Sequence, residues 1–165
     1  MPNSSKMSTV HSNRKPLQDN IDIFDGRGKG FLFQLYKNSG NTIRCSSNRF
    51  IHDLEEVDIV GNLVQKIEVQ IDKDYRVTYG SKIKGQTCIC IPDRKVAYLK
   101  EGDEVLFYSF NWKGSKFRYI YLSLDMLLKH KRINLPTQES PETGEPFWLV
   151  LLEDWSPVHY MKDYL

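Results

Sequence analysis

The chain has 165 residues, a formal net charge of +2 and 40% hydrophobic residues, which suits a single domain with terminal extensions. No signal-peptide pattern opens it and no apolar run is long enough to cross a bilayer, so a membrane protein is not expected. Its three cysteines do not form a disulfide framework, and a reducing intracellular compartment is expected.

The N-terminal third combines a polar stretch with glycine punctuation. Residues 1–20 are polar and basic without periodicity, which predicts a flexible basic arm. Between residues 26 and 30 three glycines alternate with basic residues. They predict a loop, with a backbone that lies along phosphates as the alternative. The remainder, to residue 50, fits either a hairpin or a short helix followed by a strand.

Five strands are expected between residues 57 and 123. The first runs from Val57 to Ile71 and bends at Gly61, where the missing Cβ allows one strand to serve two sheets. Alternating apolar residues place the others at 75–79, 87–91, 104–110 and 117–123. Cys88 and Cys90 alternate with isoleucines in the third strand and are expected to be small buried side chains.

The end of the chain is expected to hold a short helix and a docking tail. Leu124, Leu127 and Leu128 follow the last strand at helical spacing. Residues 134–165 are acidic but carry an apolar run from Phe147 to Leu152, so docking on the domain or on a partner is expected. The expected organisation is an arm (1–20), a barrel domain with an N-terminal extension (21–133) and this tail (134–165).

Together these elements predict an all-β fold with a small α content, a five-stranded OB-fold barrel with a short C-terminal helix. Three segments resemble the OB-folds of the replication protein A middle subunit and of the Stn-type telomere-capping subunit: Leu54–Gly61, Tyr75–Ile91 and Lys100–Val105. The turn after residue 79 and Ile91 depart from the family pattern. A weaker resemblance links Glu101–Val105 and Tyr121–Leu124 to S1-like and initiation-factor-like RNA-binding domains.

The resemblance implies binding of single-stranded DNA. The concentration of basic residues in residues 76–133 favours a polyanionic partner, and aromatic residues stand beside them. In the loop between the last two strands Trp112 can stack on a base, and Lys113 and Lys116 can neutralise phosphates. Further candidates for this nucleic-acid site are Lys82, Lys84, Arg94, Lys95, Arg118, Tyr75 and Tyr79. Ordinary solvated lysines, and tyrosines that belong to the core, are the alternative interpretation.

The resemblance implies a nuclear, chromosome-associated subunit of a telomere-capping or replication and repair complex that pairs with a second OB-fold subunit. Candidate partner-binding residues are Leu124, Leu127, Leu128, Phe147, Trp148 and Trp155. No catalytic residue, cofactor or metal site is expected, since the four histidines lack metal-ligand spacing. RNA binding of the S1-like kind and a scaffold that only joins protein partners are the alternative functions.

Overall fold

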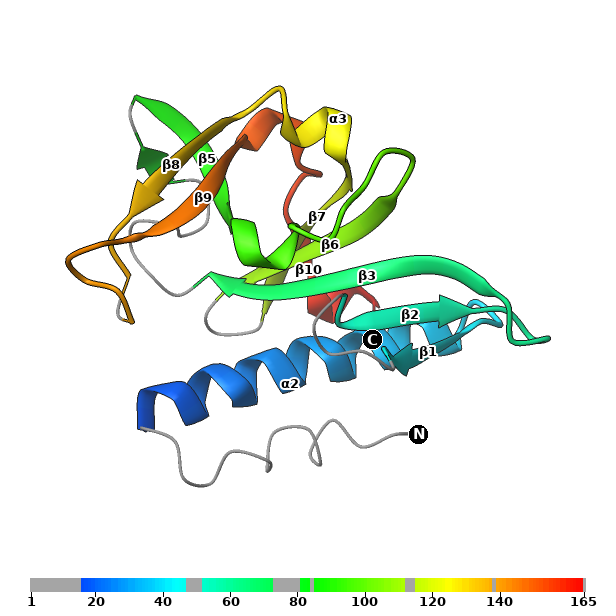
Figure 1. Ribbon diagram of the computed structural model, residues 1–165. Helices are drawn as coiled ribbons and strands as arrows, with labels where there is room; N and C mark the ends of the chain where they lie inside the picture. Colours follow the sequence, from blue (N-terminus) through cyan, green and yellow to red (C-terminus); the bar gives the residue numbers. More distant parts are fainter. Residues whose placement is uncertain are drawn as a thin grey trace.

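The computed structural model describes residues 16–46, 52–72, 81–83, 85–111, 115–137 and 139–164. Two curled sheets face each other, and one long helix packs on the outer side of the larger sheet (Figure 1). The predicted all-β class with few helices is confirmed. The curled sheets form half-barrels, although they hold more strands than the five expected. In the described part of the chain, no helix combines the length and apolarity needed to cross a membrane.

The larger sheet has the strand order β1-β2-β3-β6-β7-β10. Its strands are β1 (Thr42–Cys45), β2 (Leu54–Val57), β3 (Leu63–Asp72), β6 (Glu104–Asn111), β7 (Lys116–Ser123) and β10 (His159–Tyr160). Neighbours are antiparallel except β3 and β6, which run parallel with Ile67 opposite Leu106. A parallel pair needs a long crossover. Here that crossover contains the first two strands of the smaller sheet.

The smaller sheet is antiparallel with the order β4-β5-β9-β8. Its strands are β4 (Ser81–Ile83), β5 (Gln86–Pro92), β8 (Lys131–Leu135) and β9 (Glu145–Leu151). The segment 134–165, expected to dock as a tail, supplies β9 and the end of β8 here and β10 in the larger sheet. Its aromatic residues Phe147 and Trp155 are buried in the core.

The helical elements are α2 (Pro16–Lys37), α3 (Leu124–Leu127) and the 3-10 turns η2 (Asp93–Lys95), η3 (Leu152–Asp154) and η4 (Met161–Tyr164). The short helix expected after the last predicted strand is α3. It begins where the Ser123 hydroxyl accepts a hydrogen bond from the Met126 amide.

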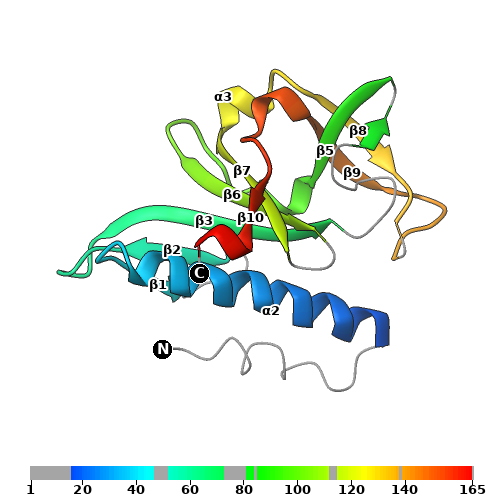
Figure 2. The same ribbon diagram turned by 180° about the vertical axis from the view of Figure 1, so that it is seen from behind.

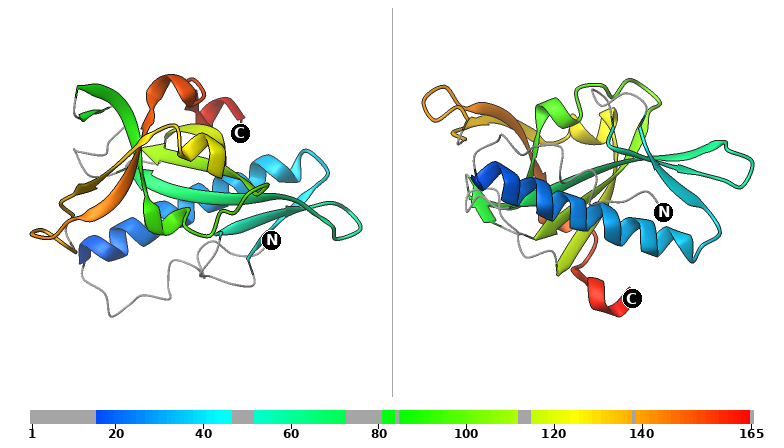
Figure 3. Two further views of the ribbon diagram at one scale, coloured as in Figure 1. Left: turned by 45° about the horizontal axis from the view of Figure 1, so that its top comes forward. Right: turned by 90° about the horizontal axis from the view of Figure 1, so that it is seen from below.

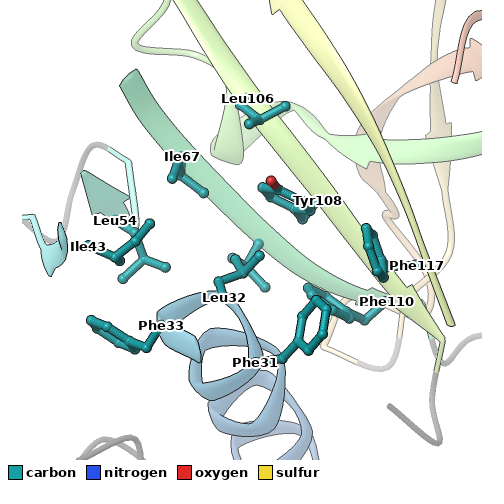
Figure 4. Packing of buried hydrophobic residues seen from close by; sticks show 11 residues of the cluster. Phe31, Leu32, Phe33, Ile43, Leu54, Ile67, Leu106, Tyr108, Phe110 and Phe117 are labelled. Carbon is teal, nitrogen blue, oxygen red and sulfur yellow. The ribbon is translucent and has the colours of Figure 1, made fainter. Parts of the chain in front are cut away.

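The expected arm and glycine loop are wrong for residues 16–37, which form α2. Glycine disfavours helix by about 1 kcal/mol, but tertiary packing overrides this propensity. Phe31, Leu32 and Phe33 at the C-terminal half of α2 are almost fully buried against the larger sheet (Figure 4). Gly28 permits the close approach, because a Cβ there would lie 3.0 Å from Cδ2 of Phe110.

Three of the expected strands are confirmed, at 87–91, 104–110 and 117–123. The expected strand at 75–79 lies outside the described residues. The strand bent at Gly61 is wrong, because β2 and β3 are separate antiparallel strands joined by a turn at 58–62. Gly61 adopts a φ of +88° in this turn, a conformation that glycine accepts without steric cost.

The core has layers on both faces of the larger sheet. On one face α2 packs against Leu106, Tyr108 and Phe110 of β6, and on the other Val105 and Phe107 pack against the smaller sheet. Figures 2 and 3 show α2 on one side of the larger sheet and the smaller sheet on the other, seen from further directions. Both faces of β6 are therefore closed to solvent, so all six residues from Val105 to Phe110 are buried.

Candidate nucleic-acid interface

A pocket of about 780 Å³ lies where the two sheets meet, and it opens widely to solvent. Residues from the start of β5, the middle of β7, the end of β9, η3 and the segment after η3 line it. These are Gln86, Thr87, Arg118, Leu151, Leu152, Glu153, Trp155 and Pro157. We call this set the pocket. Its volume is within the range of small-molecule sites, roughly 300–1,000 Å³.

Strand alternation directs Arg118 into the pocket wall. Phe117 and Tyr119 pack with the α2 cluster, whereas Ile120 belongs to the cluster between the sheets. Arg118 is even-numbered like Ile120 and therefore faces the smaller sheet. Its Nη1 donates a 3.0 Å hydrogen bond to the carbonyl oxygen of Ser156, which holds the guanidinium at the pocket edge.

Ser156 also fixes the segment that forms one side of the pocket. Its amide donates to the carbonyl oxygen of Tyr119 at 2.8 Å, and its hydroxyl accepts from the Tyr119 amide at 2.9 Å. Because both backbone groups of Tyr119 are engaged, the residues on either side of Ser156 are held along the edge of β7. Trp155 and Pro157 therefore keep a defined position beside Arg118.

Trp155 presents a polar atom that the described protein leaves unsatisfied. The indole is only 5% exposed, and its ring packs edge-on to Phe107 at 6.0 Å between centroids. Among the described residues, no acceptor lies within hydrogen-bonding distance of its Nε1–H. A buried donor without a partner costs about 1–3 kcal/mol. A ligand or water in the pocket that accepts this hydrogen bond would remove that cost.

A basic and aromatic rim continues from the pocket along β7 and β10. Tyr160 of β10 lies opposite Lys116 of β7, so both side chains lie on the same sheet face as Arg118. Lys116 Nζ lies 5.5 Å and Lys162 Nζ 5.9 Å from the centroid of the Tyr160 ring, which is 42% exposed. We call Lys116, Tyr160 and Lys162 the rim.

The opposite face of β10 is anchored by ring stacking. His159 stacks on Phe117 at 5.2 Å and on Tyr119 at 5.5 Å between centroids, and its Nδ1 hydrogen-bonds the Tyr164 hydroxyl at 2.6 Å. A two-residue strand has little backbone pairing of its own, so these contacts hold β10 on the sheet. Tyr160 is displayed from a fixed backbone.

Of the predicted nucleic-acid-binding residues, Arg118 lines the pocket, and Lys116 lies two residues before it on β7. Lys82 is exposed on β4 directly opposite the pocket residue Thr87. Arg94 lies beyond the other end of β5, where its Nε donates to Glu145 at 2.7 Å. Five further candidates, Tyr75, Tyr79, Lys84, Trp112 and Lys113, lie outside the described residues.

Lys95 belongs to an interior ionic cluster instead of the interface. Its Nζ donates to the carbonyl oxygen of Val69 at 2.6 Å and lies 3.6 Å from Asp53 Oδ2 and 3.7 Å from Glu68 Oε2. Burial raises the pKa of Glu68 to about 8, although Lys95 opposes this. Burial also acts to raise the pKa of Asp53, but the charges of Lys95 and Lys29 outweigh it and lower that pKa.

Three of the predicted partner-binding residues are core residues, so their assignment to a partner surface is wrong for this conformation. Leu127, Phe147 and Trp155 are at most 6% exposed. Trp148 is half-buried, and its Nε1 donates to Asp93 Oδ1 at 2.9 Å. Leu124 is also half-buried, whereas Leu128 is 63% exposed. Trp155 thus moves from the expected partner surface to the pocket.

The sequence reasoning missed Tyr160, Lys162 and the pocket residues of η3 and β5. The only local signal for the first two is the pairing of basic and aromatic residues in His159–Tyr164. Within the described ranges, no three His, Cys, Asp or Glu side chains are grouped so that they could hold a metal ion. Comparisons of the chain with protein-family models, curated proteins and solved structures gave no match.

Proposed function

We propose that this chain binds single-stranded DNA along the pocket and the rim. The observation that carries the proposal is the exposed Tyr160 ring, which has two ammonium groups at 5.5 Å and 5.9 Å from its centroid and lies on the sheet face that also presents Arg118. An aromatic face flanked by cations is the arrangement with which proteins grip single strands, since the ring stacks on a base and the cations neutralise phosphates.

The energetics of this surface fit a binder of modest sequence preference. Stacking on one aromatic ring contributes about 1–3 kcal/mol per base. Each lysine that neutralises a phosphate releases condensed counterions, which adds affinity that falls with salt. Lys82, Lys116 and Lys162 are exposed and so can meet phosphates without losing a buried partner.

The assembly around this activity is proposed on the sequence resemblance. We infer a nuclear, chromosome-associated subunit of a telomere-capping or replication and repair complex, with a second OB-fold subunit as partner and no catalytic activity of its own. Exposed Leu128, next to the half-buried Leu124 of α3, supports a contact near this helix. A pull-down tests that contact. The Leu128→Asp variant of this chain, used as bait, should capture less of the partner than the wild type does.

Fluorescence anisotropy with a labelled single-stranded oligonucleotide tests the binding proposal. The variant Lys116→Ala/Lys162→Ala should bind more weakly than the wild type. Its slope of log affinity against log salt should be shallower by about 1.4, since each phosphate contact on a single strand contributes roughly 0.7. The charge-matched control is Lys100→Ala/Lys129→Ala, which alters exposed residues away from the rim and should keep the wild-type slope.

Two outcomes would contradict the proposal. One is the absence of salt-dependent binding by the wild-type chain, which is what a pure scaffold predicts. The other is an equal loss of affinity in the rim variant and its control, which would place the interface elsewhere. Competition by RNA of the same base sequence reports on the 2′-hydroxyl and separates a DNA binder from an RNA binder.

A further inference from the structure

The pocket combines hydrogen-bond donors and acceptors between apolar walls, and this combination suggests what it holds. We propose that it receives one base of the bound strand and prefers guanine. This inference rests on the proposed function and deepens it, because the rim alone would grip any base sequence. The polar groups that carry it are Arg118, Trp155 and Glu153, and Leu152 and Pro157 supply apolar surface.

A nucleobase matches the general character of this pocket. Its two faces are apolar enough to lie against aliphatic side chains, while its edge requires hydrogen-bond partners. The pocket lies between the sheets and opens to solvent beside the segment that Ser156 fixes. A base that leaves the stack at the rim can therefore turn into the pocket while the backbone stays on the lysines.

The donor side of the pocket fits the acceptor edge of guanine. Arg118, whose Nη1 also donates to the carbonyl oxygen of Ser156, brings a planar guanidinium to the pocket wall, and guanine presents O6 and N7 as two adjacent acceptors to such a group. The buried Trp155 indole N–H adds a donor, and among the described residues it has no acceptor. Occupation by a base with acceptor atoms would satisfy this donor.

The acceptor side separates guanine from the other bases. Glu153 is exposed at the pocket edge, and no ion-pair partner is found for it in the described part of the chain. A carboxylate has two acceptor oxygens side by side, so it pairs best with a group that presents two adjacent, parallel donors. Only guanine places two adjacent donors, N1–H and N2–H, next to its acceptor edge. Adenine and cytosine offer one amino group, and thymine offers one ring N–H.

Oligonucleotide competition tests the preference. Thymine tracts that carry one central guanine, adenine or cytosine compete for the wild-type chain, and the guanine strand should bind about tenfold more tightly, as for one well-placed bidentate contact. Glu153→Gln should reduce this ratio toward one, because the amide has a single acceptor oxygen and places its NH2 donor where the second carboxylate oxygen stood. Glu142→Gln is the matched control at an exposed turn, and it should keep the ratio.

A second measurement does not depend on strand binding. The three tryptophans give three indole N–H resonances, and Trp155→Phe identifies the signal of Trp155. Titration with guanosine monophosphate should shift that signal, whereas cytidine monophosphate should not. Equal affinity for all four bases with salt-dependent binding intact would overturn the guanine inference and leave the proposed function standing. Absence of strand binding would refute the function itself, and an unmoved Trp155 signal would refute the pocket.

Discussion

The ammonium group of Lys95 lies 3.7 Å from the carboxylate of Glu68, a side chain that is only 2% exposed. The same ammonium donates to the carbonyl oxygen of Val69, whose amide in turn donates to Asp53 Oδ2. Lys29 of α2 reaches the other oxygen of Asp53 at 4.0 Å. Because these contacts link α2, β3 and η2, the protonation of Glu68 is coupled to how these elements pack.

Glu68 should make the stability of this protein fall as the pH rises. Its folded-state pKa is about 8, above the ordinary value of 4.5. The folded state therefore keeps a proton that the unfolded state releases in this interval. The stabilisation is complete below the unfolded pKa and is lost as the pH approaches 8. This contribution should decrease the free energy of unfolding by up to about 1.4 kcal/mol per pH unit.

The variant Glu68→Gln isolates this contribution in urea unfolding between pH 5 and pH 8. Glutamine cannot titrate, so the free energy of unfolding of the variant should lack the fall with pH that Glu68 causes in the wild type. The difference, variant minus wild type, should therefore rise with pH. Asp53, Lys95, Lys29 and Tyr98 surround Glu68. The lowered pKa of Asp53 and the raised pKa of Tyr98 keep both groups from titrating in this interval. Glu104→Gln, at an exposed carboxylate, should run parallel to the wild type. Parallel curves for Glu68→Gln would contradict the coupling.

Replacement of Gly28 by alanine should destabilise the protein although alanine is the better helix former. The new Cβ would lie 3.0 Å from Cδ2 and 3.1 Å from Cε2 of Phe110. Phe110 cannot move easily, because it is fully buried among Phe31, Phe117 and Tyr108. Overpacking of this kind costs about 1–3 kcal/mol. Thermal and chemical denaturation should therefore show a net loss of stability, because this cost exceeds the gain in helix propensity from alanine.

A double-mutant cycle checks the cause of that loss. Phe110→Leu removes the ring atoms that meet the new Cβ, so Gly28→Ala should cost less in the Phe110→Leu background than in the wild type. Equal costs in both backgrounds would show that the loss arises within α2 itself and not from its contact with β6.

The same contact explains why α2 could not be predicted from the sequence. Local propensity at Gly28 argues for a loop, and only the position of Phe110, far along the chain, makes a glycine useful in a helix there. By contrast, β5, β6 and β7 carry their alternation and their turn residues locally. Gly102, with a φ of +87°, is such a turn residue, and these strands were predicted at nearly the observed bounds.

The candidate site was predictable only where a single strand carries it. Arg118 and Lys116 lie two residues apart on β7, so the sequence could assign both to one surface. Trp155 and Gln86 come to the same pocket through the pairing of β5 with β9. No local pattern distinguishes a buried indole that lines a pocket from one that covers a partner surface, and Trp155 was therefore assigned to the wrong surface.

The stability of the turn that joins β2 to β3 should depend on the Asp58 side chain and not on the exposed apolar residues of the turn. Asp58 Oδ1 accepts hydrogen bonds from the amides of Val60 at 3.0 Å and Asn62 at 2.9 Å. Asp58→Ala should lower the free energy of unfolding by about 1 kcal/mol or more, since both amides lose their acceptor. Ile59 is 89% exposed, so Ile59→Ser should change it by less than about 0.5 kcal/mol. A larger loss for Ile59→Ser than for Asp58→Ala in urea denaturation would contradict this view of the turn.

The three cysteines should differ sharply in reactivity toward an aromatic disulfide reagent that releases a coloured thiolate. Cys45 is exposed, whereas Cys88 and Cys90 are at most 1% exposed, with their sulfur atoms 3.9 Å apart. The hydrogen bond from Cys90 lowers the pKa of the Cys88 thiol. Burial nevertheless keeps the reagent away from both, because Ile83 and Leu149 pack over them.

One thiol should react in the native protein and three in denaturant, and Cys45→Ser should abolish the native reaction. Rapid native labelling of the Cys45→Ser variant would show that the smaller sheet opens readily.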